Sequence, residues 1–142
     1  MTTLKSEALD IAPYIIGAAQ GRVYAVDALN GAPVWENGLK EGGYGVPALA
    51  ITGRRVFTSA HGPILFCLGY RTGDLMWTAP TSKSGRATIL VHEKRLYVAK
   101  GGAIDCFTTG GERLFSRIID DIGGSSMALG YPGKVVQGDE RG

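Results

Sequence analysis

The sequence has few of the features that mark the commonest functional classes. Its two cysteines, Cys67 and Cys106, are too few for a disulfide framework or, by themselves, for a zinc site. The 15 Lys and Arg residues nearly balance the 13 Asp and Glu residues and form no basic run, which argues against nucleic acid as a ligand. No apolar run approaches the ~20 residues of a membrane-spanning helix. We therefore expect no nucleic-acid ligand and no membrane span.

The N-terminal segment also lacks an export signal. Residues 1–21 carry acidic side chains where a signal peptide needs a basic region followed by an unbroken apolar stretch. We expect a cytoplasmic location on this basis. A component of a virus or phage particle is equally compatible with the sequence.

Glycine, in contrast, is abundant. The 22 glycines are roughly twice the usual ~7% share, as in folds with many tight turns. Three turn glycines, each followed four residues later by a large aromatic side chain, mark an internal repeat. The pairs are Gly31 with Trp35, Gly73 with Trp77, and Gly111 with Phe115. Successive glycines lie 42 and 38 residues apart, a period typical of stacked supersecondary units.

Each repeat contains short apolar or β-branched runs separated by turn residues, which predicts strands A, B, C and D. The second repeat shows the runs most fully, over residues 46–53, 54–62, 63–73 and 74–80. We predict repeat units at residues 8–41, 42–81 and 82–119, and a half-unit with strands A and B at residues 122–142. The first strand A (residues 7–12) is weak, and a short helix candidate at residues 3–11 lacks an amphipathic stripe.

Four-stranded antiparallel units that repeat every ~40 residues are the blades of a β-propeller. We therefore predict an all-β fold of about three and a half blades in an incomplete ring. The faces of a blade must be covered by its neighbours, and a large flat ring fills such a gap well. We expect Trp35, Trp77 and Phe115 to dock one blade on the next. The alternative is that these rings form a stacking platform for a base or a cofactor.

The first repeat also carries a family resemblance. The stretch "AVDALNGAPVW" resembles the tryptophan-docking motif of pyrroloquinoline-quinone-like (quinoprotein-type) β-propeller repeats, which reads Ala-x-Asp-x-x-x-Gly-x-x-x-Trp. The matching residues are Ala25, Asp27, Gly31 and Trp35. The second copy keeps Thr72, Gly73 and Trp77, and the third keeps only Gly111 and the aromatic Phe115. The resemblance extends over roughly residues 8–142 and implies the propeller fold.

The resemblance does not bring an enzymatic activity with it. Quinone-dependent dehydrogenases of this family hold calcium or a lanthanide through carboxylate and amide side chains, and many have adjacent cysteines beside the quinone. The sequence has no such cysteine pair, and the family also contains non-enzymatic scaffolds. We therefore expect a non-catalytic interaction or structural module without a cofactor. The alternative is a subunit or fragment of a quinoprotein-like dehydrogenase, or a small-ligand sensor with its pocket on the propeller axis.

The two cysteines occupy different positions when the repeats are aligned on their turn glycines. Cys67 then matches Ala25, whereas Cys106 matches Val26. Because strand side chains alternate between the faces of a sheet, we expect the thiols to point to opposite sides of their sheets. We interpret both as buried free thiols.

The other chemistry-bearing residues give no recognisable site. His61 in a predicted B–C turn and His92 at the end of a predicted strand A have no neighbour at metal-ligand spacing, so we interpret them as surface or turn residues. Asp120 and Asp121 precede a Gly-Gly-Ser-Ser segment that could form an anion nest or a calcium loop. A solvated loop between blades is the simpler interpretation.

Three and a half blades do not close a ring, because propellers typically close with four to eight blades. An open arc exposes the apolar faces of its terminal blades and an unpaired strand edge. We therefore expect head-to-tail association, in which two copies form one ring of about six or seven blades. A larger partner protein, or further blades of a longer chain, would fill the gap equally well.

Overall fold

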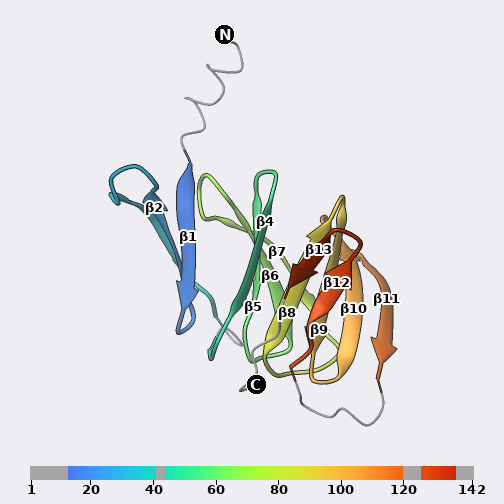
Figure 1. Cartoon of the computed structure of the whole chain (residues 1–142). Coiled ribbons are helices and arrows are strands. Elements are labelled where there is room, and N and C mark those ends of the chain that lie inside the picture. Colours follow the sequence, from blue (N-terminus) through green and yellow to red (C-terminus); the bar gives the residue numbers. More distant parts are fainter. Residues whose placement is uncertain (1–12, 41–43, 120–125, 137–142) are drawn as a thin grey trace.

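A computed structural model describes residues 13–40, 44–119 and 126–136 (Figure 1). Within these ranges the chain forms β-strands and no helix, and the strands make four antiparallel sheets. The first sheet contains β1 (Tyr14–Ala19), β2 (Arg22–Asp27) and β3 (Pro33–Gly38), and the second contains β4 (Ala48–Thr52), β5 (Arg55–Ser59), β6 (Ile64–Gly69) and β7 (Leu75–Pro80). The third sheet contains β8 (Ala87–His92), β9 (Arg95–Lys100), β10 (Ala103–Thr108) and β11 (Arg113–Ile118), and the fourth contains β12 (Leu129–Tyr131) and β13 (Lys134–Val136).

Neighbouring strands in every sheet are also consecutive in the sequence. The second and third sheets are complete blades with strands A to D, the first has strands B to D, and the fourth has strands A and B. Figure 1 shows the sheets standing side by side in an arc that does not close. The predicted all-β fold of propeller blades in an incomplete ring is confirmed. The weak strand predicted at residues 7–12 and the helix candidate at residues 3–11 lie outside the described residues.

In three successive sheets, strands A and B are joined by a turn of two residues at the equivalent position. The residue pairs that close these turns are Thr52 with Arg55, His92 with Arg95, and Tyr131 with Lys134. The last residue of strand A is therefore equivalent in the second, third and fourth sheets. Thr52, His92 and Tyr131 are these last residues, and they lie at one end of their neighbouring sheets.

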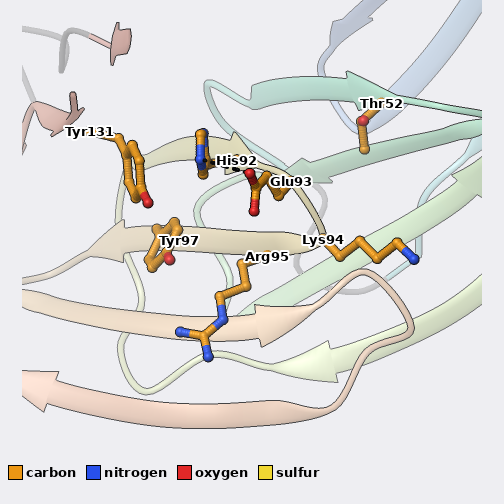
Figure 2. A pocket seen from close by; sticks show the side chains of 7 residues that line it. All are labelled: Thr52, His92, Glu93, Lys94, Arg95, Tyr97 and Tyr131. Carbon is orange, nitrogen blue, oxygen red and sulfur yellow. Dashed lines mark ion pairs between the residues drawn. The ribbon is translucent and has the colours of Figure 1, made fainter. Parts of the chain in front are cut away.

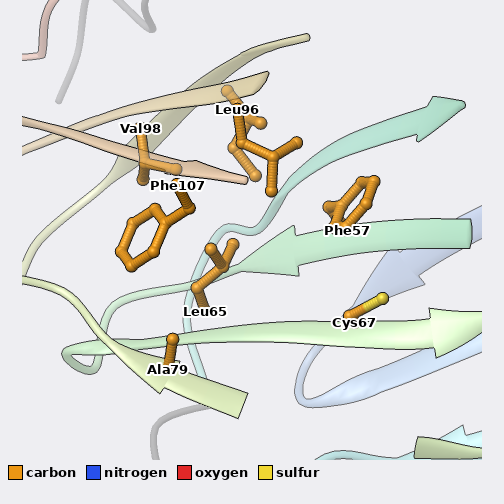
Figure 3. Close-up of a cluster of buried hydrophobic side chains, with 8 residues drawn as sticks. Phe57, Leu65, Cys67, Ala79, Leu96, Val98 and Phe107 are labelled. Atoms are coloured by element: carbon orange, nitrogen blue, oxygen red, sulfur yellow. The ribbon is translucent and has the colours of Figure 1, made fainter. Parts of the chain in front are cut away.

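The hydrophobic core lies between the sheets. The largest cluster fills the space between the second and third sheets (Figure 3). Its buried members are Phe57, Leu65, Cys67, Ala79, Ile89, Leu96, Val98 and Phe107. Smaller clusters around Val23, Val56 and Leu68 and around Leu90 and Leu129 join the first sheet to the second and the third to the fourth. Each blade is thus held by apolar contact with the next one.

The cysteines lie at equivalent positions, so the prediction that they point to opposite faces is wrong. Cys67 pairs across the sheet with Trp77, and Cys106 pairs with Phe115. The reason is the length of the C–D turn. The amide of Gly69 donates to the carbonyl oxygen of Asp74, five residues on, whereas the equivalent bond in the third sheet joins Thr108 to Glu112, four residues on. Aligning the repeats on their glycines hides this shortening by one residue.

Both cysteines are free and buried, as predicted. Burial raises the pKa of the Cys67 thiol to about 11 and also raises the pKa of the Cys106 thiol. A thiol must lose its proton to act as a nucleophile or a metal ligand. These two side chains are therefore core residues and give no reactive site.

Candidate functional site

Trp35 and Trp77 each contact the turn glycine of the following sheet. The ring of Trp35 lies so close to Gly73 that a Cβ atom built there would come within 2.4 Å of it, and the ring of Trp77 leaves 2.9 Å at Gly111. The indole nitrogens donate to the carbonyl oxygens of Tyr70 (2.9 Å) and Thr109 (3.2 Å) in the same turns. Two successive pairs of blades therefore meet through the same arrangement, a ring on a glycine.

Other residues of the motif shape the C–D turns. Ala25 is buried and pairs with Trp35 across the sheet. The Asp27 carboxylate accepts a hydrogen bond from the Leu29 amide at 2.8 Å, and the Thr72 hydroxyl accepts one from the Asp74 amide at 3.2 Å. Such bonds between a side chain and the backbone two residues on favour tight turns. These side chains hold the loops that present the glycines.

Phe115 occupies the position of the two tryptophans but differs from them in its surroundings. Its side chain is 45% exposed, and no glycine turn lies against it within the described residues. The fourth sheet packs on β8, the innermost strand of the third sheet, and leaves β11 uncovered. At the other end of the arc, a Cβ atom built on Gly31 would meet nothing within 4 Å. In the part of the chain that the structure describes, the third sheet thus presents an aromatic ring that no glycine turn covers, and the first sheet presents a turn glycine that no ring covers.

A polar network is buried between the second and third sheets around Lys100. The Lys100 ammonium group, at the end of β9, donates to the Ser59 hydroxyl at 2.8 Å and to the carbonyl oxygen of Gly62. Asp105 accepts hydrogen bonds from the amide and the hydroxyl of Ser82, at 2.8 and 2.6 Å. Burial lowers the pKa of Lys100 to about 8, against an opposing effect of Asp105.

A serine beside a lysine with a lowered pKa is also an arrangement used for nucleophilic catalysis. Here Ser59 is 0% and Lys100 3% exposed, so a substrate has no access to either side chain. The Ser59 hydroxyl donates to the carbonyl oxygen of Ile64 in its own blade. We therefore interpret the pair as a structural contact between blades.

The lowered pKa of Lys100 predicts a pH-dependent stability. An unfolded lysine has a pKa of ~10.4, so between pH 8 and pH 10 the unfolded chain binds more protons than the folded one. The free energy of unfolding should therefore rise with pH in this window. Relative to Lys100→Met, we expect the wild-type value to gain up to about 3 kcal/mol between pH 7.5 and pH 10.5. Urea unfolding at several pH values measures this difference, and a flat or falling difference would contradict the assignment.

A pocket of about 750 Å³ lies where the A–B turns of three sheets meet (Figure 2). It is lined by Thr52, His92, Glu93, Lys94, Arg95, Tyr97 and Tyr131. The rings of His92 and Tyr131 are stacked, with their centres 3.7 Å apart. Arg95 and Tyr97 also line the pocket, and the Glu93 carboxylate lies 3.6 Å from His92 Nε2. The stacked rings of His92 and Tyr131 form an aromatic wall of the pocket, and charged side chains of both signs lie beside this wall.

Sequence reasoning placed His92 at the end of strand A but missed the pocket. The signal was present in the repeat, because Thr52, His92 and Tyr131 are the last residues of three successive strands A. Equivalent corners of neighbouring blades necessarily lie close together in a propeller. The other histidine, His61, is exposed in the B–C turn, as expected. Asp120 and Asp121, the candidates for an anion or calcium loop, lie outside the described residues.

Side-by-side antiparallel sheets joined by rings on turn glycines define a β-propeller repeat protein. The chain belongs to the family described as outer membrane protein assembly factor BamB, whose model matches residues 19–117. This match confirms the resemblance to quinoprotein-type propeller repeats. No curated protein sequence matches the chain.

Solved structures share the fold at low sequence identity. BamB from Moraxella catarrhalis is 21% identical, with a TM-score of 0.64 over 85% of this chain and 37% of that one. A europium-containing methanol dehydrogenase is 16% identical, with a TM-score of 0.61 over 72% and 22%. The computationally designed Ika8 protein is 17% identical, with a TM-score of 0.67 over 89% and 40%. The chain spans two fifths or less of each, and these likenesses establish the fold alone.

Two features are absent from the described residues. No group of three or more His, Cys, Asp or Glu side chains there is placed to hold a metal ion. The same residues include no helix with the length and apolar character needed to cross a membrane.

Proposed function

We propose that the chain is a non-catalytic scaffold that binds other protein molecules through its propeller surfaces, first of all further copies of itself in head-to-tail association. The observation that carries the proposal is the complementarity between the two ends of the arc. Among the described residues, no glycine turn lies against the exposed ring of Phe115, and no aromatic ring lies against the turn glycine Gly31. Within the chain, the equivalent pairs Trp35–Gly73 and Trp77–Gly111 are the contacts that join blades.

The apolar surface of the outer strands supports the same proposal. Every residue of β11 is exposed, including Leu114 (40%), Phe115 (45%) and Ile118 (49%). On the first sheet, Ile15 and Val34 are exposed as well. A contact between these two surfaces would remove apolar area from water at each end of the arc. The description of the family as an assembly factor agrees with a role in holding other proteins.

The solution mass of the purified chain tests the proposal. We expect light scattering to give a mass of about twice the 15.0 kDa of one chain, because two arcs supply the blades that one ring needs. Phe115→Glu should return the mass to that of one chain, since a buried unpaired carboxylate opposes the contact. Leu75→Glu is the matched control, because Leu75 is an exposed residue of the outer strand of the second sheet, and it should leave the mass unchanged.

A well-folded wild-type chain that stays monomeric at high concentration would refute self-association. Equal masses for the wild type and Phe115→Glu would show that β11 is not the contact surface. A chain that becomes soluble only with a co-expressed protein would replace self-association by a heterologous partner and would keep the scaffold role.

A further inference from the structure

The pocket between the A–B turns lies within a concentration of positive charge. Five cationic residues stand at or beside the three turns that meet there. They are Arg54, Arg55, Lys94, Arg95 and Lys134, against the single carboxylate of Glu93. Over the whole chain, positive and negative side chains nearly balance. The net charge around these three turns is therefore more positive than that of the chain as a whole. Charge complementarity therefore favours an acidic ligand.

The cations of the pocket have donors left for a ligand. Arg55 and Lys134 already donate to the carbonyl oxygens of Thr109 and Val91. Lys94 and Arg95 are both exposed, and the five N–H groups of a guanidinium can bond to several acceptors at once. Figure 2 shows Lys94 and Arg95 leaving the turn in different directions. Two separated cations suit a segment with several carboxylates better than a single small anion.

The aromatic wall adds an apolar contact surface beside these charges. Tyr131 remains 38% exposed although it is stacked on His92. An exposed aromatic ring with a free face is a frequent anchor in protein interfaces. A pocket of about 750 Å³ holds one or two side chains of a peptide.

The backbone at the pocket is strained. Glu93 has a φ angle of +56°, a left-handed conformation that costs a residue with a side chain roughly 1–2 kcal/mol. The equivalent position in the second sheet is taken by Gly53, with a φ angle of +60°. Strain of this kind is frequent at binding sites. Here it places a carboxylate at the pocket, 82% exposed and beside His92.

We propose that this pocket binds a short acidic segment of a partner protein, and this inference rests on the scaffold function proposed above. Side-chain carboxylates of the segment pair with Lys94 and Arg95, and an aromatic side chain packs on the pair formed by His92 and Tyr131. The Glu93 carboxylate repels the carboxylates of the segment and so limits its affinity.

Fluorescence anisotropy on the purified chain tests the inference. The probe is a short labelled peptide of aspartate and glutamate around one phenylalanine, and the control peptide has the corresponding amides. A thymidine oligonucleotide of similar length tests nucleic acid. We expect the acidic peptide to bind at least tenfold more tightly than the amide peptide and the oligonucleotide, and to be released by salt.

Two charge-reversal variants localise the binding. Lys94→Glu combined with Arg95→Glu should weaken peptide binding at least tenfold. Lys40→Glu combined with Lys83→Glu changes the net charge equally at exposed residues that neither line the pocket nor lie on β11, and it should change binding less than twofold. Glu93→Gln should tighten binding several-fold, because it removes a like charge.

Several results would overturn the inference. These are equal losses in the two double variants, weaker binding by Glu93→Gln, no binding of the acidic peptide, or tighter binding of the oligonucleotide. The mass measurement separates this inference from the scaffold proposal. If the wild type and the Lys94→Glu/Arg95→Glu variant both associate, while neither binds peptide, the pocket inference fails and the scaffold remains.

Discussion

Replacing Trp77 by alanine should lower the free energy of unfolding by ~3–5 kcal/mol, the usual cost of removing a large aromatic side chain from a packed site. The ring contacts Phe57 at 5.9 Å between centres, packs on the largest core cluster and covers Gly111. We expect a loss in the same range for Trp35→Ala, since Trp35 packs on the cluster around Val56 and on Gly73. Urea unfolding followed by circular dichroism measures both values.

The control for these variants is Leu75→Ala in the same outer strand as Trp77. Leu75 is 54% exposed, so its truncation should cost less than about 1 kcal/mol. A loss below about 1 kcal/mol for Trp77→Ala or Trp35→Ala, together with loss of partner binding, would instead identify that tryptophan as a binding-site residue.

The substitution of Gly73 by alanine should also destabilise the fold strongly. Its φ angle of +78° disfavours any residue with a side chain, and the new Cβ atom would meet the Trp35 ring at 2.4 Å. Gly31 has the same φ angle of +78° but open space around its Cβ position. Backbone strain is therefore equal in the two alanine variants, and only Gly73→Ala adds a steric clash. In monomeric protein we expect Gly73→Ala to cost at least about 2 kcal/mol more than Gly31→Ala. Similar costs at both positions would contradict the tight contact between ring and glycine.

Local sequence signals were sufficient to predict the strands and their repeat. Turn residues and β-branched runs depend on backbone preferences over a few residues, and the distance from glycine to aromatic is four residues in all three copies. The contacts of Trp35 and Trp77 follow from this pattern once blades stand side by side. The surroundings of Phe115 do not, because they depend on what the next blade supplies.

The remaining features depend on distances in space that no local pattern encodes. The shorter turn between Thr108 and Glu112 shifted Cys106 by one place relative to its glycine, and this reversed the predicted side of the sheet. The bond between Lys100 and Ser59 joins residues 41 positions apart in different blades. The pocket could have been predicted from the sequence, because aligning the last residues of the A strands places His92 and Tyr131 at equivalent positions of neighbouring blades.

A ring on a glycine fixes the first sheet on the second and the second on the third, and a double-mutant cycle between Trp35 and Gly73 tests this arrangement most directly. Trp35→Leu keeps an apolar side chain at this position but removes the flat ring that contacts Gly73. In this background, Gly73→Ala should cost no more than Gly31→Ala, because only the backbone strain remains. The predicted result is a coupling free energy between the two positions of at least about 1 kcal/mol, measured by urea unfolding of the four proteins. Additive effects of Trp35→Leu and Gly73→Ala would contradict the claim.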